Sequence, residues 1–255
     1  MELRRLEEQE HQKTRKLWEE VFSDDTRAFL DYYYFIKTKE NEIWVIEEDG
    51  EIQSMLQLNP YQLQVAEHPF LCRYIIAVAT RAQYRSRGYM SSLLRKAMQE
   101  MYGKKEPFTF LMPAAEAIYT PYDFRFVYSQ RQAVFEKKAE TELIEEEDAT
   151  MFQAEELAAF AKERLFGTAR VYAVRDAHYY QTRVLEQQSE NGGIRMLKKD
   201  GKLVGIYCYA KEETCEVLEP LILPGYETVF WDSISGLSEK PVKVLACPEV
   251  LEPCA

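Results

Sequence analysis

Residues 74–102 contain the stretch that most restricts the fold, because an apolar run, an arginine-glycine loop and an amphipathic run follow one another. The first part, YIIAVAT, has the continuous apolar character of a buried strand. After Gly88, apolar side chains recur at the spacing of a helix that lies on a sheet. They are Met90, Leu93, Leu94, Ala97, Met98 and Met101. The stretch predicts a strand, a turn and a helix within an α/β domain.

The loop QYRSRGYM, residues 83–90, predicts an anion site. A helix N-terminus presents unpaired N–H groups and a partial positive charge, which together attract anions. Gly88 would let the backbone approach a phosphate, and Arg85 and Arg87 could add charge-assisted contacts. The preceding strand could pair with an extended, peptide-like arm. A diphosphate joined to such an arm describes coenzyme A.

The remaining pattern predicts a mixed sheet flanked by helices. Asp49-Gly50 is a strong hairpin signal between two strands. Ser23, Asp24 and Asp25 are candidates to cap the second helix. We expect helices over 7–22, 26–37, 90–102 and 114–119, and strands over 42–46, 52–58, 61–65, 70–80, 108–112 and 126–138.

The chain divides into three predicted parts: a first domain at 1–138, an acidic linker at 139–150 and a second domain at 151–255. Residues 31–58 and 176–209 both run from an acidic-aromatic helix to a strand, an Asp-Gly turn and a strand. We interpret the second as a degenerate copy of the first. The alternative is an accidental match, since a helix with a hairpin is common. The second half has no counterpart of YRSRGYM, so we expect only the first module to bind cofactor.

Composition favours a globular protein and excludes several classes. Hydrophobic residues make up 46% and charged residues 29% of the chain. The net charge of −11 argues against nucleic-acid binding and mildly favours cationic ligands, although much of it could simply aid solubility. The charged N-terminus does not resemble a signal peptide, and no apolar run is long enough to span a bilayer. The five cysteines are Cys72, Cys208, Cys215, Cys247 and Cys254, an odd count that we interpret as reduced thiols in a cytoplasmic protein.

The sequence contains no motif of a zinc enzyme, a serine hydrolase or a P-loop nucleotide-binding protein. His11, His68 and His178 are isolated, so we expect no metal. No G-x-S-x-G elbow or Walker A loop is present.

The segment VATRAQYRSRGYMSSLL resembles the coenzyme A-binding motif of the GNAT superfamily of N-acetyltransferases, Arg/Gln-x-x-Gly-x-Gly/Ala after a strand. Arg85, Gly88 and Met90 fill its marked positions, and Met90 departs from the usual small residue. The Arg-x-Arg-Gly pair, and the later PAAEAIYTPYDFRFVY, are similar to the Eis (enhanced intracellular survival) family. This resemblance implies a GNAT fold followed by a second, degenerate GNAT-like module. Eis proteins usually add a sterol-carrier-like domain, for which 255 residues leave no room.

The resemblance also implies cofactor contacts, with acetyl-coenzyme A as co-substrate. A backbone N–H near Val78, Ala79 and Thr80 would polarise the thioester carbonyl. The phosphates would lie on the loop and helix start, formed by Arg85, Ser86, Arg87, Gly88, Tyr89 and Met90.

The resemblance implies the catalytic residues less directly than it implies the cofactor contacts. Tyr119 matches the GNAT tyrosine that acts as general acid, or it is an aromatic that packs on the sheet, with Tyr122 as substitute. Phe124 occupies the Eis acid position and cannot donate a proton. Glu116 is the candidate base, and the alternative is a solvent-facing carboxylate.

The acceptor side and the chain end also carry candidate residues. Eis enzymes use a C-terminal carboxylate as base, a role that is in doubt for Ala255. Asp24 and Asp25 could attract a cationic substrate, and Tyr33 could line the acceptor pocket or pack in the core.

The leading hypothesis is an N-acetyltransferase that acts on a primary amine of a small molecule, without nucleic-acid or membrane partners. One alternative is a catalytically weak or inactive module that keeps coenzyme A as a bound ligand. Another is a protein N-acetyltransferase that modifies lysines or chain termini. The superfamily resemblance is compatible with a homodimer.

Overall fold

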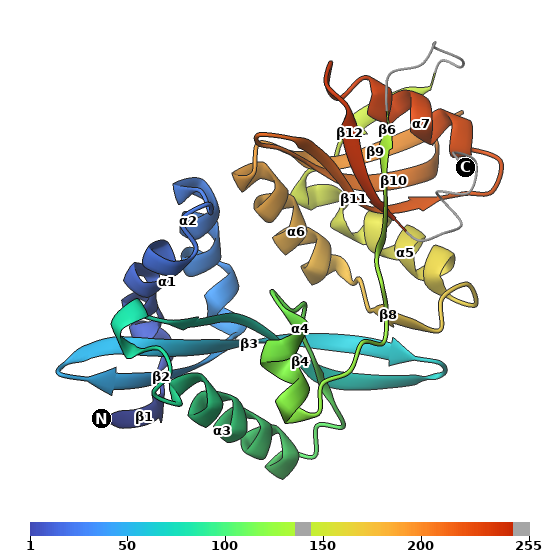
Figure 1. Ribbon diagram of the computed structural model, residues 1–255. Coiled ribbons are helices and arrows are strands. Elements are labelled where there is room, and N and C mark those ends of the chain that lie inside the picture. Colours follow the sequence, from blue (N-terminus) through green and yellow to red (C-terminus); the bar gives the residue numbers. More distant parts are fainter. Residues whose placement is uncertain (136–143, 247–255) are drawn as a thin grey trace. The chain divides into compact units, whose positions relative to one another are not determined.

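The chain folds into two compact units, each built on its own sheet. The computed structural model describes residues 1–135 and 144–246 (Figure 1). The first unit comprises Met1–Phe124 together with Arg170–Val174. The second comprises Arg125–Ala169 and the chain from Arg175 onward. Each sheet is mixed and carries helices, so the expected α/β class is confirmed.

The first sheet has the strand order β1-β2-β3-β4-β5, with β8 added to β3. All neighbouring strands are antiparallel except β4 and β5, which are parallel. Its strands are β1 (Glu2–Arg5), β2 (Glu42–Glu48), β3 (Glu51–Val65), β4 (His68–Thr80), β5 (Thr109–Phe110) and β8 (Val171–Ala173). Its helices are η1 (Glu8–Thr14), α1 (Arg15–Val21), α2 (Arg27–Phe35), η2 (Lys37–Glu40), η3 (Ala82–Tyr84), α3 (Tyr89–Gly103), α4 (Glu116–Tyr119) and η4 (Thr120–Tyr122), where η marks a 3₁₀ helix.

Strand β3 is one continuous strand, whereas the sequence predicted two that were separated around Pro60. Pro60 pairs with Arg73 of β4 within the part of the ladder that runs without a shift from Gln57 to Val65. On the other side of β3, β2 pairs as far as Leu58 and β8 begins at Leu63. The proline therefore lies where one side of β3 is paired with no strand of the described residues, a position in which a missing N–H costs little.

The N-cap of helix α2 lies one residue after Asp25, the last of the three predicted cap residues. The Thr26 hydroxyl accepts a hydrogen bond of 3.1 Å from the Phe29 N–H, so Thr26 is the N-cap. The expectation that Ser23, Asp24 or Asp25 caps this helix was wrong. The Asp25 carboxylate instead accepts a hydrogen bond of 2.6 Å from the Trp18 indole N–H.

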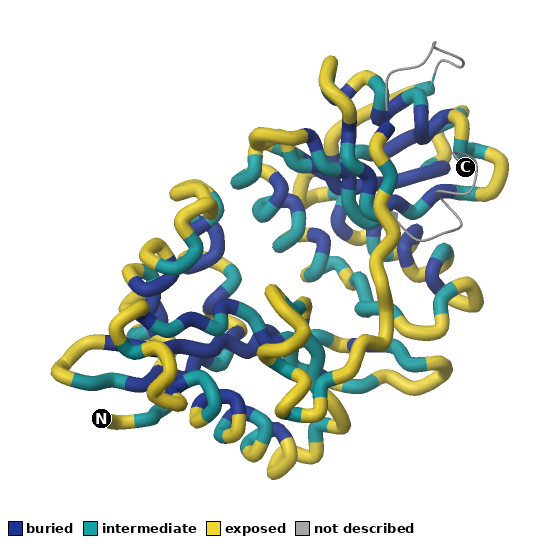
Figure 2. The backbone as a smooth tube through the Cα atoms, in the orientation of Figure 1, coloured by how far each residue is buried: buried dark blue, intermediate teal, exposed yellow. Residues whose placement is uncertain are grey.

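Helices cover both faces of the first sheet (Figure 1). Helix α3 packs its apolar stripe on one face, as its spacing predicted, while α1 and α2 lie on the opposite face. The tube in Figure 2 shows the central part of this sheet as buried. The α3 core consists of Trp44, Ile46, Leu56, Leu58, Ile75, Tyr89, Leu93, Leu94, Ala97 and Met101.

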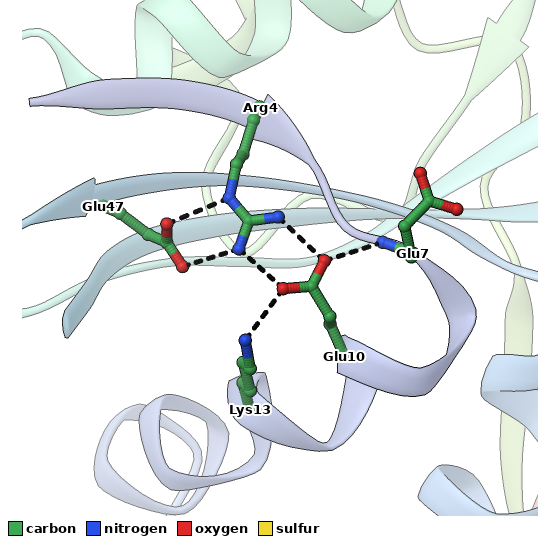
Figure 3. A network of polar contacts seen from close by, with 5 residues as sticks. All are labelled: Arg4, Glu7, Glu10, Lys13 and Glu47. Atoms are coloured by element: carbon green, nitrogen blue, oxygen red, sulfur yellow. Dashed lines mark hydrogen bonds and ion pairs between the residues drawn. The ribbon is translucent and has the colours of Figure 1, made fainter. Parts of the chain in front are cut away.

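An ion-pair network closes the N-terminal edge of this unit (Figure 3). Arg4 of β1 donates to both carboxylate oxygens of Glu47 on β2, each at 2.9 Å. The same guanidinium donates to Glu10 of η1 at 2.8 and 2.9 Å, and Lys13 donates to Glu10 at 2.8 Å. One arginine therefore ties two strands and a helix together through bidentate contacts.

The second sheet has the strand order β6-β12-β11-β10-β9-β7, with only β11 and β12 parallel. Its strands are β6 (Arg131–Phe135), β7 (Glu145–Asp148), β9 (Gly193–Lys199), β10 (Lys202–Lys211), β11 (Cys215–Ile222) and β12 (Val242–Ala246). Its helices are η5 (Met151–Gln153), α5 (Ala154–Leu165), α6 (Ala177–Ser189) and α7 (Glu227–Ser235).

The two units share one succession of elements, which confirms the predicted internal repeat. Each has a first strand, two helices, a hairpin followed by a third strand, then a helix and a last strand that is parallel to the third one. Both hairpins turn through an Asp-Gly pair with positive φ, at 57° and 76° for Asp49-Gly50 and 51° and 72° for Asp200-Gly201.

The unit limits differ from the expected domains at 1–138 and 151–255. The predicted final strand of the first domain, 126–138, contains β6, which pairs with β12 in the second sheet. The predicted linker at 139–150 contains β7, which pairs with β9. Arg195 and Lys198 of β9 form ion pairs with the β7 carboxylates, so the acidic segment has cross-strand partners that composition did not reveal. Residues 136–143 lie outside the described residues.

Candidate functional site

Strand β4 bends at a bulge near its C-terminal end. Ala77 has a φ of 52°, and the pairing shifts between Met55↔Ala79 and Gln57↔Ile76. Ala77 and Val78 therefore lie opposite the single residue Leu56. The bulge explains why Ile75 and Val78 both contact the α3 core, although regular alternation places residues i and i+3 on opposite faces.

Strands β4 and β5 separate just before this bulge. Their ladder consists of Arg73↔Thr109 and Tyr74↔Phe110, whereas β4 continues to Thr80. The β5-facing edge of β4 is thus open along the residues from Ile75 to Thr80 in the described ladder. This edge includes Val78, Ala79 and Thr80, the predicted carbonyl-polarising residues. An open edge offers backbone N–H and C=O groups to an extended ligand, as a further strand would use them.

The loop after β4 leads into the N-terminus of α3. Gly88, with a φ of 82°, is the N-cap residue, and its carbonyl accepts a hydrogen bond of 3.0 Å from the Ser92 N–H. Because Gly88 has no side chain, the N–H groups of Tyr89, Met90 and Ser91 have no side-chain cap. A Cβ on Gly88 would meet no atom within 4 Å, so in the free protein this glycine is needed for its φ. The helix start therefore has the open N–H groups that a phosphate binds.

Both arginines of the loop are exposed but held in place. The Arg85 Nε donates a hydrogen bond of 3.2 Å to the Thr80 carbonyl oxygen. The Arg87 guanidinium lies 4.6 Å from the ring centre of Tyr84. Ser86 is exposed in the left-handed region, with a φ of 62°. The loop thus presents two cations beside an open helix N-terminus.

The side chains of the two residues that open α3 pack into the α3 core, and the Tyr89 ring also lies 6.0 Å from the Tyr84 ring of the loop. The Tyr89 ring is buried in the α3 core, and its hydroxyl donates to the Glu48 carboxylate, which raises the Tyr89 pKa. Met90 is half-buried and packs against the same core. Met90 can therefore replace the usual small residue without occupying the loop, so only its backbone N–H is offered to a ligand.

Tyr119 lies at the end of α4 and is half-buried. Its ring meets the Phe124 ring edge-on at 5.8 Å and packs against the α3 core. Burial, with a smaller effect of the nearby Tyr74, raises the Tyr119 pKa above its usual value. The phenol is therefore protonated at neutral pH, which a proton donor requires. Glu116 is exposed on the first turn of the same short helix.

The predicted acceptor residues are separated by the fold. Tyr33 is a core residue, 3% exposed, and its hydroxyl contacts Gln57, Asn59 and Asn41. Burial raises the pKa of Tyr33 far above its usual value. Asp24 and Asp25 are exposed in the α1–α2 connection. Tyr33 is therefore buried in the core, whereas both aspartates lie on the solvent-exposed surface.

A hollow of about 680 Å³ opens between α1 and α2. Its lining combines carboxylates, arginines and apolar side chains, and includes Asp25 from the predicted set. Arg15 is tied to Glu19 at 2.9 Å and to Asp31 at 2.6 Å, which neutralises part of the acidic charge. The lining residues are Arg15, Glu19, Phe22, Ser23, Asp25, Arg27, Leu30, Asp31 and Phe35.

Arg81 is a supporting residue that sequence reasoning missed. It follows β4 directly, is 7% exposed, and pairs with Glu20 at 3.2 Å and Glu51 at 2.5 Å. These contacts fix the end of β4 to α1 and to the start of β3. Nothing in the sequence distinguishes this arginine from its exposed neighbours.

Residues 2–127 match the family model described as an acetyltransferase (GNAT) domain. This chain carries a GNAT acetyltransferase domain. The bulged strand, the separated neighbour and the arginine-glycine loop all lie within the matched residues. No curated protein matches the sequence of the chain.

Solved structures with the same architecture extend beyond the GNAT domain. A conserved protein of unknown function from Enterococcus faecalis V583 has a TM-score of 0.78 at 14% identity, over 95% of this chain and 64% of that one. A GCN5-related N-acetyltransferase from Kribbella flavida has a TM-score of 0.73 at 13% identity, over 97% and 65%. Eis1 from Mycobacterium abscessus has a TM-score of 0.69 at 14% identity, over 100% and 68%.

These similarities show the fold of both units. The chain spans about two thirds of the length of these structures, from 64% to 68%. The expected GNAT domain followed by a second, Eis-like module is confirmed. No described helix is long and apolar enough to cross a membrane.

Proposed function

We propose that the first unit is an acetyl-coenzyme A-dependent N-acetyltransferase that acts on a primary amine of a small molecule. The observation that carries this proposal is the open edge of β4, which ends beside the uncapped N-terminus of α3 and two exposed arginines. The diphosphate would bind the N–H groups of Tyr89, Met90 and Ser91. The pantetheine amides would pair with the open edge of β4.

Transfer forms an N–C bond to the acetyl carbon and breaks its C–S bond. A backbone N–H among Val78, Ala79 and Thr80 would stabilise the negative charge on the thioester oxygen. The amine attacks in its neutral form and gives up a proton to water or to Glu116. Tyr119 would give its proton to the departing thiolate and regain one from solvent. A thiol pKa of about 8.5 makes this last assistance modest.

The hollow between α1 and α2 is our candidate for the acceptor site. Glu19, Asp25 and Asp31 could attract a cationic amine, while Phe22 and Phe35 could cover its apolar part. The arginines in the lining argue for an acceptor of modest charge. Replacing Asp25 by Asn should raise KM for the amine and leave coenzyme A affinity unchanged, with Asp24→Asn as the matched control outside the lining.

The test begins with binding and continues with turnover. Calorimetry should detect acetyl-coenzyme A binding to the purified chain, and thiol release should detect transfer across a panel of amines and lysine-containing peptides. Binding without turnover on any acceptor would favour the inactive coenzyme A-binding module, which the exposed Glu116 and the Phe124 substitution also support. Absence of binding at millimolar ligand would reject the proposal. Turnover on peptides alone would replace the small-molecule acceptor with a protein one.

A further inference from the structure

The second sheet carries a bulge at the same place as the first, but a charged side chain occupies it. The β10–β11 pairing shifts between Ile206↔Leu221 and Cys208↔Leu218, so Glu219 and Pro220 lie opposite Tyr207. Glu219 has a φ of 55°, close to the 52° of Ala77 in β4. Each bulge lies on the strand that has a parallel neighbour. Glu219 is therefore the counterpart of Ala77.

Three side chains hold the Glu219 carboxylate. The Tyr179 hydroxyl donates to it at 2.7 Å, and Nη2 of Arg183 lies 3.2 Å away. Nη2 of Arg175 lies at 3.4 Å from the same carboxylate. The side chains of Arg175, Arg183 and Glu219 are 16%, 14% and 25% exposed, so the contacts are largely shielded from solvent. Such shielding strengthens each charge-assisted contact.

Arg183 also pairs with Glu186 at 2.6 Å, yet the cluster has more donors than these two carboxylates satisfy. Within residues 1–135 and 144–246, Nε of Arg175, Nε of Arg183 and the Tyr180 hydroxyl are buried without a hydrogen-bond partner. Buried donors normally have acceptors, so the surroundings of Glu219 favour an anion. Burial alone would raise the Glu219 pKa, but Arg175, Arg183 and Tyr179 outweigh it and hold the pKa at about 2. The occupant is therefore a charged carboxylate.

The phosphate-binding features of the first unit have no counterpart beside this bulge. The connection from β11 to α7 is short, and the Gly225 N–H donates a hydrogen bond of 2.9 Å to the Glu227 carboxylate of α7. A carboxylate already lies at this helix start, which disfavours a phosphate there. The groups of the second unit that attract an anion lie at its bulge, so they differ from the phosphate site at the helix start of the first unit.

We propose that the bulge of the second sheet is a binding site for a small carboxylate, and that its resident occupant is the protein's own Glu219. Arg175, Arg183 and Tyr179 form the receptor, and the side chain of Glu219 fills it from the adjacent backbone. Formate or acetate should enter when that side chain is removed. This inference does not depend on acetyl transfer by the first unit.

The test uses the full chain with Glu219→Gly, because glycine tolerates the positive φ at this position. We expect this variant to melt below the wild type in sodium chloride. At matched ionic strength, formate or acetate should raise its Tm by about 3 °C more than chloride does. The wild type should show no such difference, because Glu219 fills the site.

Glu219→Gln is the matched control, since its amide fills the same volume and should prevent formate from entering. Equal melting of the Gly variant in formate and chloride would overturn the proposal, as would an equal formate effect on the wild type or the Gln variant. If the Gly variant is recovered unfolded, it is refolded from urea in each salt. Refolding only in formate or acetate would support the proposed carboxylate site. Equal refolding in these salts and in chloride would reject it.

Discussion

The Nε of Arg85 donates a hydrogen bond of 3.2 Å to the carbonyl oxygen of Thr80, which joins the arginine-glycine loop to the end of the bulged strand. The Arg87 guanidinium is held in a different way, over the ring of Tyr84. Both cations are therefore placed beside the start of α3 before any ligand binds. Such preorganisation reduces the entropy lost on binding.

Replacing these arginines should weaken coenzyme A binding without unfolding the chain. We expect Arg85→Ala and Arg87→Ala each to raise the Kd for coenzyme A by about 10-fold, because each removes a charge-assisted contact. Calorimetry measures the change, with Lys39→Ala, an exposed cation of η2, as control. Unchanged affinity in the double variant would show that the phosphates bind elsewhere.

Gly88→Ala should destabilise the fold through backbone conformation alone. The φ of 82° disfavours a side chain, while the space around the new Cβ is open. We expect a loss of about 1 kcal/mol in the free energy of unfolding. Gly103→Ala, at a glycine of α3 without a positive φ and with equally open surroundings, should be neutral or stabilising in the same urea titration. Equal losses in both variants would contradict the conformational explanation.

Tyr119→Phe should lower kcat and leave the affinity for acetyl-coenzyme A unchanged. The substitution removes the hydroxyl and keeps the ring that packs on Phe124, so stability should change little. We expect a loss of roughly 10²-fold, the lower end for a general acid. Tyr122→Phe is the matched control. A loss confined to the Tyr122 variant would transfer the role of proton donor to that residue.

The Arg4 network predicts how stability depends on pH. Hydrogen bonds from Arg4 lower the pKa of Glu10 and Glu47, with Lys13 adding to the effect on Glu10. Because these folded-state pKa values lie below that of an unfolded glutamate, about 4.3, the stabilisation is present above that pH and is lost as pH falls further. Arg4→Met should lower Tm at pH 7 by more than it does near pH 3, as thermal melts will measure. Arg5→Met, at a more exposed arginine with one pair at 3.7 Å, should show a smaller effect at either pH.

Strand β8 should protect the end of β3 from exchange. The Val174 N–H donates to Gln62 at 2.8 Å and the Ala66 N–H to Arg170 at 2.6 Å, on either side of the Gln64↔Tyr172 pair. Tyr172→Pro removes an N–H from this ladder, so hydrogen exchange should accelerate at residues 62–66. Tyr172→Phe keeps the backbone and should leave exchange unchanged. Unaltered protection in the proline variant would show that β8 contributes nothing to the first sheet.

Much of the site was visible in the sequence because its signals are local. The apolar run, the arginine-glycine loop and the stripe from Met90 to Met101 are contiguous, and each reports its own conformation. The same holds for the Asp-Gly turns, whose positive φ is a property of those residues. The strand, loop and helix and the degenerate second copy followed from such patterns, and the resemblance to the GNAT motif rested on the same residues.

Other features depended on partners distant in the chain. The composition of the acidic residues of β7 predicted a linker, but in the structure they form a strand whose carboxylates pair with Arg195 and Lys198 across the sheet. The aromatic run at Tyr33 resembled a pocket lining, yet Gln57, Asn59 and Asn41 bury its hydroxyl.

The sequence by itself determined the strand, loop and helix that run from β4 to α3, and which loop presents the cations. Only the tertiary structure decided where β4 bulges, that β5 leaves it after two pairs, and that Arg175, Arg183 and Tyr179 surround Glu219. The reason is physical. Backbone conformation follows largely from neighbouring residues, whereas strand pairing and buried charge depend on contacts between residues far apart in the chain.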